Sequence, residues 1–129
     1  MRNGGRRKTF ASRYWQNYDP EQQGVDQMGR QIEVPDVDVA PKSLTIQVGD
    51  LLVFGGTGGY VRSGQTVLEM LGAFLPGVLV ENGQILSPAG FPNSVVFLAR
   101  HPGQAVIDVV TGDPFRAPQT TQLHIIVTS

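Results

Sequence analysis

Cysteine is absent from this 129-residue sequence, and charged residues are scarce. Without cysteine the chain can form neither a disulfide framework nor a thiolate metal site. Charged residues make up 16% of the chain, and the formal net charge of −1 gives no overall attraction to nucleic acid. The chain instead has 16 glycines and 9 prolines, a composition typical of a turn-rich β protein. Its length and its 40% hydrophobic content predict one domain with one core.

Long apolar runs are also missing. No segment approaches the length that a bilayer-spanning helix needs, so we expect no membrane contact. Residues 1–30 contain basic residues but no apolar stretch long enough for the central region of a secretory signal. We therefore expect the chain to be made and kept in the cytosol, or assembled there into something larger.

Residues 1–40 differ in composition from the rest and are predicted to form an extended arm. Half of the ten basic residues lie in the first thirteen positions, and aromatic residues follow closely. Interfaces favour arginine, tyrosine and tryptophan. We therefore predict that the arm docks on a partner protein through Arg6, Arg7, Phe10, Tyr14, Trp15 and Tyr18. The alternatives are a leader that tucks its aromatic residues back onto the domain, or an arm that binds nucleic acid through charge and stacking. An acidic protein surface suits it better than nucleic acid.

The last third of the chain predicts the fold class. Apolar residues alternate with other residues in three runs, and this period of two marks half-buried strands. The predicted inward residues are Val95, Phe97 and Ala99, then Ala105, Ile107 and Val109, then Leu123, Ile125 and Val127.

Further strands are predicted at 44–48, 51–54 and 60–62, with a glycine-rich break at 55–59 that should hold no regular element. Residues 65–73 fit either a helical turn or a strand, and we favour a strand because Gly72 and Pro76 oppose a long helix. A hairpin is predicted at 78–86, with Asn82-Gly83 in a type I′ turn. Seven to nine short strands result, which is the pattern of an all-β sandwich or small barrel.

Two stretches resemble bacterial and phage Ig-like β-sandwich domains. They run from Leu44 to Asp50, a strand followed by Gly-Asp, and from Val96 to Val109, which contains Phe-x-Ala and Pro-Gly before an alternating strand. The resemblance implies an Ig-like β-sandwich at 41–129, preceded by the arm at 1–40. It implies a fold class and no particular function.

A looser similarity is to the chagasin-like inhibitors of papain-type cysteine peptidases. Gly55-Gly-Thr-Gly-Gly-Tyr60 is similar to the first binding motif of that family, and Asp113-Pro114-Phe115 falls where its third motif would. The chain departs from the family in lacking Asn-Pro-Thr-Thr-Gly, an arginine before Pro114, and the double glycine of the middle loop at 88–91. The resemblance implies contacts through loops 55–60, 87–92 and 111–119, with candidate contact residues Gly56, Thr57, Gly58, Tyr60, Phe91 and Phe115.

Chemistry-bearing residues do not form a recognisable set. His101, in a turn, and His124, out of phase with the core residues, should both be exposed, and neither has a partner at metal-ligand spacing. Asp36 and Asp38 could form a weak calcium site with Asp50, but a solvated edge explains them better. Asp108 is expected to be an exposed carboxylate on the outward face of its strand. No nucleophile elbow or phosphate-binding loop is present, so we expect no enzyme activity, no metal and no cofactor.

These observations favour a non-enzymatic structural protein, most specifically a phage virion accessory such as a capsid decoration (cement) protein. Its partners would be the major capsid protein or other virion subunits, in a homo-oligomer or lattice, assembled in the host cytoplasm. The alternative is a free-standing binding module, either a chagasin-like peptidase inhibitor or an adhesion domain, whose contacts come from loops at one end of the sandwich.

Overall fold

The computed structural model describes residues 10–11, 13–14, 29–87 and 89–129. Within the arm, β1 (Phe10–Ala11) and β2 (Arg13–Tyr14) pair in parallel as two-residue strands. The other predicted arm contacts lie outside the described residues: Arg6, Arg7, Trp15 and Tyr18. The docking role of the arm therefore stays a prediction.

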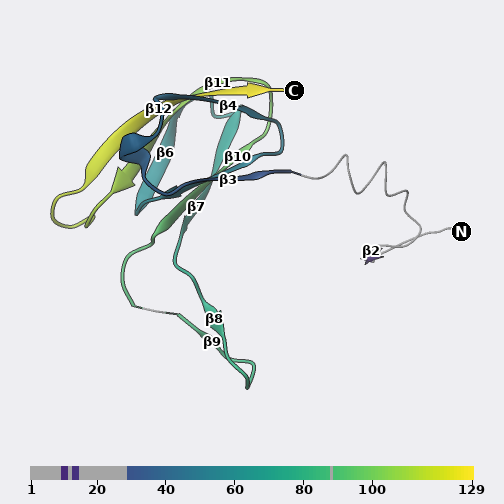
Figure 1. Cartoon of the computed structure of the whole chain (residues 1–129), viewed down its shortest axis with the longest axis vertical. Coiled ribbons are helices and arrows are strands. Elements are labelled where there is room, and N and C mark those ends of the chain that lie inside the picture. The colour runs from purple at the N-terminus through teal and green to yellow at the C-terminus, as the bar shows by residue number, and fades with distance from the viewer. Residues whose placement is uncertain (1–9, 12, 15–28, 88) are drawn as a thin grey trace, which may run out of the picture.

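Two four-stranded sheets form the body of the molecule (Figure 1). The first sheet has the order β3 (Gln31–Val34), β5 (Leu51–Gly55), β10 (Ser94–Ala99) and β7 (Leu68–Phe74). The second has the order β4 (Ser43–Gln47), β12 (Gln119–Thr128), β11 (Gly103–Thr111) and β6 (Gly58–Ser63). Only the pairs β3–β5 and β4–β12 are parallel among these neighbours. The predicted all-β sandwich is confirmed. Its eight strands include β3, which the sequence did not predict, and leave out the two predicted hairpin strands at 78–86.

The core lies between the sheets, where the alternating residues meet. All nine inward residues predicted for the last three strands are buried, and Phe54 and Phe97 pack edge to face with ring centroids 5.8 Å apart. Such aromatic pairs favour this geometry because a ring edge is positive and a ring face is negative. The prediction from the period of two is therefore confirmed residue by residue.

The sandwich begins earlier in the chain than the composition indicates. β3 pairs with β5, and Val37, in the 3₁₀ helix η2 (Val37–Val39) that leads to β4, is buried in the core. Ile32 and Val34 also pack against the core. Residues 31–39, which their composition assigns to the arm, therefore belong to the sandwich, and the predicted boundary at residue 41 is too late.

The ambiguous segment at 65–73 contributes strand β7, as favoured. The predicted hairpin is also present, with β8 (Val78–Leu79) antiparallel to β9 (Ile85–Leu86). Its turn differs from the predicted type I′. Val80 N donates to Gln84 O, and Gly83 N donates to Val80 O, so the loop holds three residues, with Gly83 at φ 88°. Left-handed backbone at the last loop position is what glycine supplies most readily.

The glycine-rich segment is more regular than predicted. β5 continues to Gly55 and β6 starts at Gly58, so the chain crosses from one sheet to the other within two residues. A Cβ on Gly56 would lie 2.8 Å from Val110 O, and one on Gly59 would lie 2.6 Å from Asp108 O. These glycines allow the crossing chain to approach β11 closely, so packing within the chain explains them.

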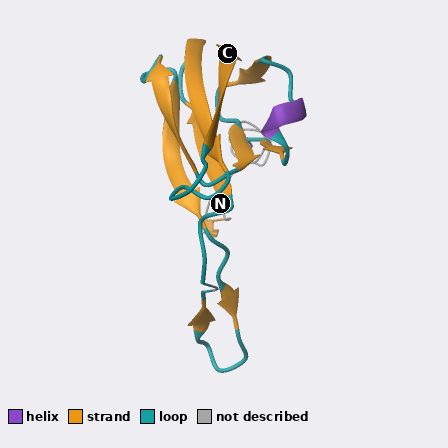
Figure 2. Cartoon of the chain, turned by 90° about the vertical axis from the view of Figure 1, so that its left-hand side faces the viewer, coloured by secondary structure: helices purple, strands orange, loops and turns teal. Residues whose placement is uncertain are grey.

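The connections between strands lie at two opposite ends of the sandwich, which we call the proximal end and the distal end. At the proximal end lie the turn at 48–50 and the connections at 64–67 and 100–102. At the distal end lie the crossing at 56–57, the long connection at 75–93 and the loop at 112–118. Figure 2 shows the β8–β9 hairpin standing away from both sheets. None of the described residues forms a helix long and apolar enough to cross a membrane.

Candidate functional site

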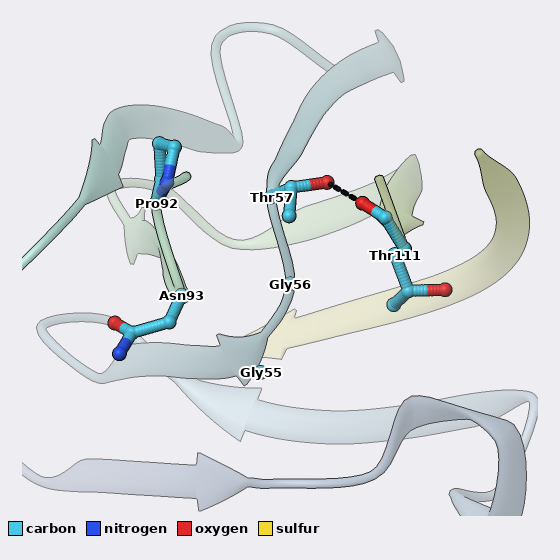
Figure 3. A pocket seen from close by; sticks show the side chains of 7 residues that line it. Gly55, Gly56, Thr57, Pro92, Asn93 and Thr111 are labelled. Carbon is cyan, nitrogen blue, oxygen red and sulfur yellow. Dashed lines mark hydrogen bonds between the residues drawn. The ribbon is translucent and has the colours of Figure 1, made fainter. Parts of the chain in front are cut away.

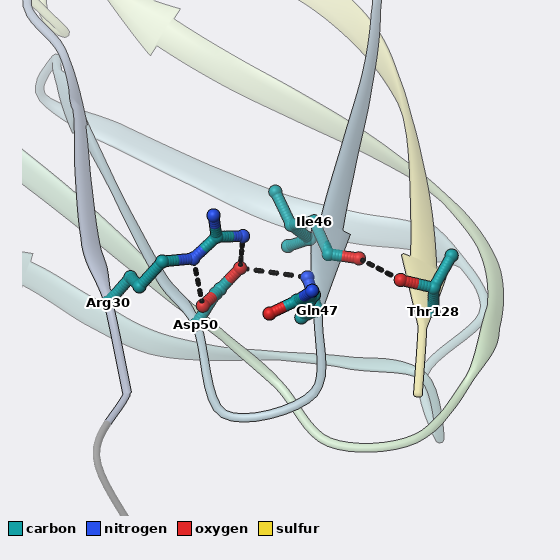
Figure 4. Close-up of polar contacts among 5 residues, drawn as sticks. All are labelled: Arg30, Ile46, Gln47, Asp50 and Thr128. Carbon is teal, nitrogen blue, oxygen red and sulfur yellow. Dashed lines mark hydrogen bonds and ion pairs between the residues drawn. The ribbon is translucent and has the colours of Figure 1, made fainter. Parts of the chain in front are cut away.

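A charged cluster at the proximal end fastens β3 to the turn before β5 (Figure 4). Arg30 Nε donates to Asp50 Oδ1 at 3.0 Å, and Arg30 Nη2 donates to Oδ2 at 2.5 Å. Gln47 N also donates to Asp50 Oδ2, at 2.8 Å. The Asp50 side chain is buried, and the Arg30 hydrogen bond lowers its pKa although burial acts in the opposite direction. Asp50 is thus a structural ion-pair partner.

The weak calcium alternative fails on the same geometry. Asp50 is bound to Arg30, whereas Asp36 Oδ1 caps η2 by accepting from Asp38 N at 3.0 Å. Within residues 29–87 and 89–129, no three metal-ligating side chains gather. His101 and His124 are both exposed, as predicted, and His124 Nε2 lies 3.0 Å from Gln104 Oε1.

Acid is expected to weaken the fold through Asp50. Because its folded-state pKa is lowered, ionised Asp50 stabilises the fold above the ordinary carboxyl pKa of 3.8, and this contribution is lost as the pH falls through the folded-state value. We expect Asp50→Asn to lower the thermal midpoint at neutral pH and to lose less on acidification than the parent. The check is a series of thermal melts from neutral pH to below pH 3.8. An equal acid loss in both proteins would contradict this role.

Asp108 was predicted to be an exposed carboxylate, but it is buried, with a relative exposure of 1%. Arg62 Nε donates to Asp108 Oδ2 at 2.5 Å, and the Arg62 guanidinium also lies 5.5 Å from the centre of the Tyr60 ring. Both covering side chains come from β6, whose Tyr60 is the direct cross-strand neighbour of Asp108. The hydrogen bond raises the pKa of Arg62. The prediction that Asp108 lies on the outward face of its strand was right, and the prediction that it is exposed was wrong. An alternation pattern does not reveal which side chains of the neighbouring strand cover a residue.

The three loops that sequence similarity singled out meet at the distal end. An open cavity of about 290 Å³ is lined by residues of all three: Gly55, Gly56, Thr57, Pro92, Asn93, Thr111 and Gly112 (Figure 3). Thr57 joins two of them, because its backbone N donates to Val110 O at 2.8 Å and its Oγ1 donates to Gly112 O at 3.1 Å. Gly56 N donates to Asn93 O at 3.3 Å and joins the third.

Two predicted contact residues form an exposed aromatic pair at the same end of the sandwich. The rings of Phe91 and Phe115 are 5.8 Å apart, and Phe115 is 84% exposed. Gly56 and Thr57 line the cavity, whereas Gly58 does not line it, and Tyr60 lies on the outer face of β6 beside Arg62. The loop contacts therefore divide into a distal group and Tyr60.

The hairpin is the part of the site that sequence reasoning missed. Val78, Leu79, Ile85 and Leu86 are 53–68% exposed, and Phe74 at its base is 48% exposed. One signal was available in the sequence: from Met70 to Ala99, Glu81 is the only charged residue. A hairpin so poor in charge and so exposed is unusual on an isolated domain, because large apolar patches mark binding surfaces.

Comparison with known proteins gives no family assignment. No family model matches the chain, and no curated protein matches it. Among solved structures, the cysteine protease inhibitor EhICP2 from Entamoeba histolytica has a TM-score of 0.46 at 11% identity, over 78% of this chain and 96% of that one.

Two further solved structures are similar at the same level. Amebosin has a TM-score of 0.42 at 18% identity, over 78% of this chain and 99% of that one. A proline-to-glycine mutant of amicyanin has a TM-score of 0.35 at 16% identity, over 78% and 82%. All three TM-scores lie below 0.5, so we rest no conclusion on them.

Proposed function

We propose that the chain is a non-catalytic protein-binding module that contacts its partner with the distal end of the sandwich. The observation that carries the proposal is the apolar hairpin, whose four aliphatic side chains are 53–68% exposed. The exposed Phe91–Phe115 pair belongs to loops at the same end of the sandwich. Aromatic and aliphatic anchors that lose their water on binding supply most of the energy of an interface. The distal end provides both kinds of anchor next to the two four-stranded sheets.

The partner class that we propose is a papain-type cysteine peptidase. Support comes from the similarity of 55–60 and 113–115 to chagasin-like motifs, together with the meeting of these loops at one end. The departures from those motifs concern residues that would contact the partner. The hairpin is therefore the main anchor in this proposal, with Phe115 as the second.

Inhibition of papain tests the proposal directly. We expect the chain to inhibit hydrolysis of a fluorogenic peptide, and we expect Phe115→Ser and Ile85→Ser each to weaken inhibition at least tenfold, because each removes an exposed anchor. The matched control is Val48→Ser, which changes an apolar residue 42% exposed in the proximal turn and should leave inhibition unchanged. Full papain activity at a large molar excess of the chain would overturn the inhibitor proposal. Equal losses in all three variants would overturn the distal location.

Truncation separates this proposal from the virion prediction, which rests on the composition of the arm. A truncated chain of residues 29–129 keeps Arg30 and β3, and thus the contacts that hold the first sheet. The distal-end proposal expects it to inhibit papain as the full chain does. A role as a capsid decoration protein, with a location in the virion, instead requires the truncated chain to lose its affinity for capsid subunits.

A further inference from the structure

The outer edge of β8 carries free backbone groups. Among the described residues β8 pairs only with β9, with Val78 opposite Leu86 and Leu79 opposite Ile85. Val80 N donates to Gln84 O, so Val80 and Gln84 form a hydrogen-bonded pair. Such pairs alternate with non-hydrogen-bonded ones in an antiparallel ladder, so Leu79 directs its N–H and C=O away from β9. Figure 1 shows β8 and β9 apart from the two four-stranded sheets, so within the described residues both groups are available to another strand.

We propose that this edge pairs with the same edge of a second copy of the chain. The two β8 strands would lie antiparallel about a two-fold axis through Leu79. Residues that face each other at a hydrogen-bonded position exchange both backbone hydrogen bonds. Leu79 of each copy would thus donate its N–H to, and accept from, Leu79 of the other, and the two hairpins would form one four-stranded sheet.

The side chains of β8 suit pairing with an identical strand. A two-fold interface must be complementary to itself. About Leu79, Val78 of one copy faces Val80 of the other, and Glu81 lies in the loop beyond the paired residues, so no like charges meet. The same operation about Ile85 on β9 would set polar Gln84 against Leu86. The β8 edge is therefore the better match.

Pairing also gives the hairpin what it lacks alone. A two-stranded hairpin is marginally stable in water, whereas three or more strands support one another. The two-fold contact uses the β8 edge of both copies, so it closes as a dimer. The dimer would cover the hairpin that the proposed function uses, so self-association and partner binding would compete. The dimer can be tested independently of the proposed function, because a measurement of molecular mass detects it without any partner protein.

Mass measurement of the full chain in solution tests the proposal. We expect sedimentation equilibrium to show a reversible dimer. Leu79→Pro should raise the dimer dissociation constant at least tenfold, because it removes the outward N–H while a sheet edge tolerates proline. Leu79→Lys and Leu79→Glu should each be monomeric, since like charges would face each other at the axis. An equimolar mixture of these two variants should restore the dimer.

The matched control is Ile85→Lys, which adds the same charge to the cross-strand neighbour on β9. It should keep the dimer if β8 is the contact edge. A parent chain that stays monomeric at every concentration would overturn the proposal and leave the hairpin to other partners. So would an Ile85→Lys variant as monomeric as Leu79→Lys, or a lysine–glutamate mixture that fails to pair although circular dichroism shows both variants folded.

Discussion

Phe97→Ala is expected to lower the free energy of unfolding by about 4 kcal/mol, the usual loss when a buried aromatic side chain is truncated. Phe97 is fully buried in β10, the strand between β5 and β7, and its ring packs against Phe54. Its removal loses the transfer free energy of the ring and leaves a cavity that two facing sheets cannot close. Urea denaturation followed by circular dichroism measures the effect.

The neighbouring residue provides the control for this variant. Val96 lies on the same strand with its side chain on the opposite face and is only partly buried. Val96→Ala should therefore cost about 1 kcal/mol or less, as substitutions outside the core usually do. Similar losses from Phe97→Ala and Val96→Ala would mean that the core does not lie between the two sheets.

Gly59→Ala is expected to destabilise the fold by about 3 kcal/mol, because overpacking forces the backbone to move. The added methyl group would lie 2.6 Å from the carbonyl oxygen of Asp108 and 3.3 Å from the ring of Phe97. Neither can withdraw easily, since Asp108 belongs to β11, the neighbouring strand, and Phe97 is held in the core. Thermal and urea denaturation of the purified variant provide the measurement.

The adjacent Gly58 is a matched control for this position. A Cβ there would meet only Val110 Cβ, at 3.9 Å, which is ordinary contact. Gly58→Ala should change stability by less than about 0.5 kcal/mol, as a substitution without a clash does. If both variants were equally unstable, the flexibility of the glycine segment would matter more than its close approach to β11.

The fold class could be predicted from the sequence because the core residues of the last three strands keep a strict period of two. That period comes directly from the geometry of a strand, and it located nine buried residues without reference to their partners. The start of the sandwich was less predictable. β3 is short and its residues are only partly buried, so its composition resembles that of the arm.

The candidate site could be predicted only in part. The loops that meet at the distal end were identifiable from motif similarity, but the burial of Asp108 depends on Arg62, which is 46 residues away in the chain. The exposure of the hairpin is likewise a tertiary property. Its sequence predicts strands and a turn, and the same apolar residues would suit a buried hairpin equally well.

The Arg30–Asp50 cluster has a mechanical consequence. Leu51 N donates to Arg30 O, and Val48 N donates to Thr128 O, so the start of the first sheet and the end of the last strand are both fastened to one proximal turn. A pulling force applied between Arg30 and Thr128 would load this turn first, one hydrogen bond after another. The hairpin lies outside that force path. A molecule held by these two points would keep its distal loops unstrained until the proximal turn gave way.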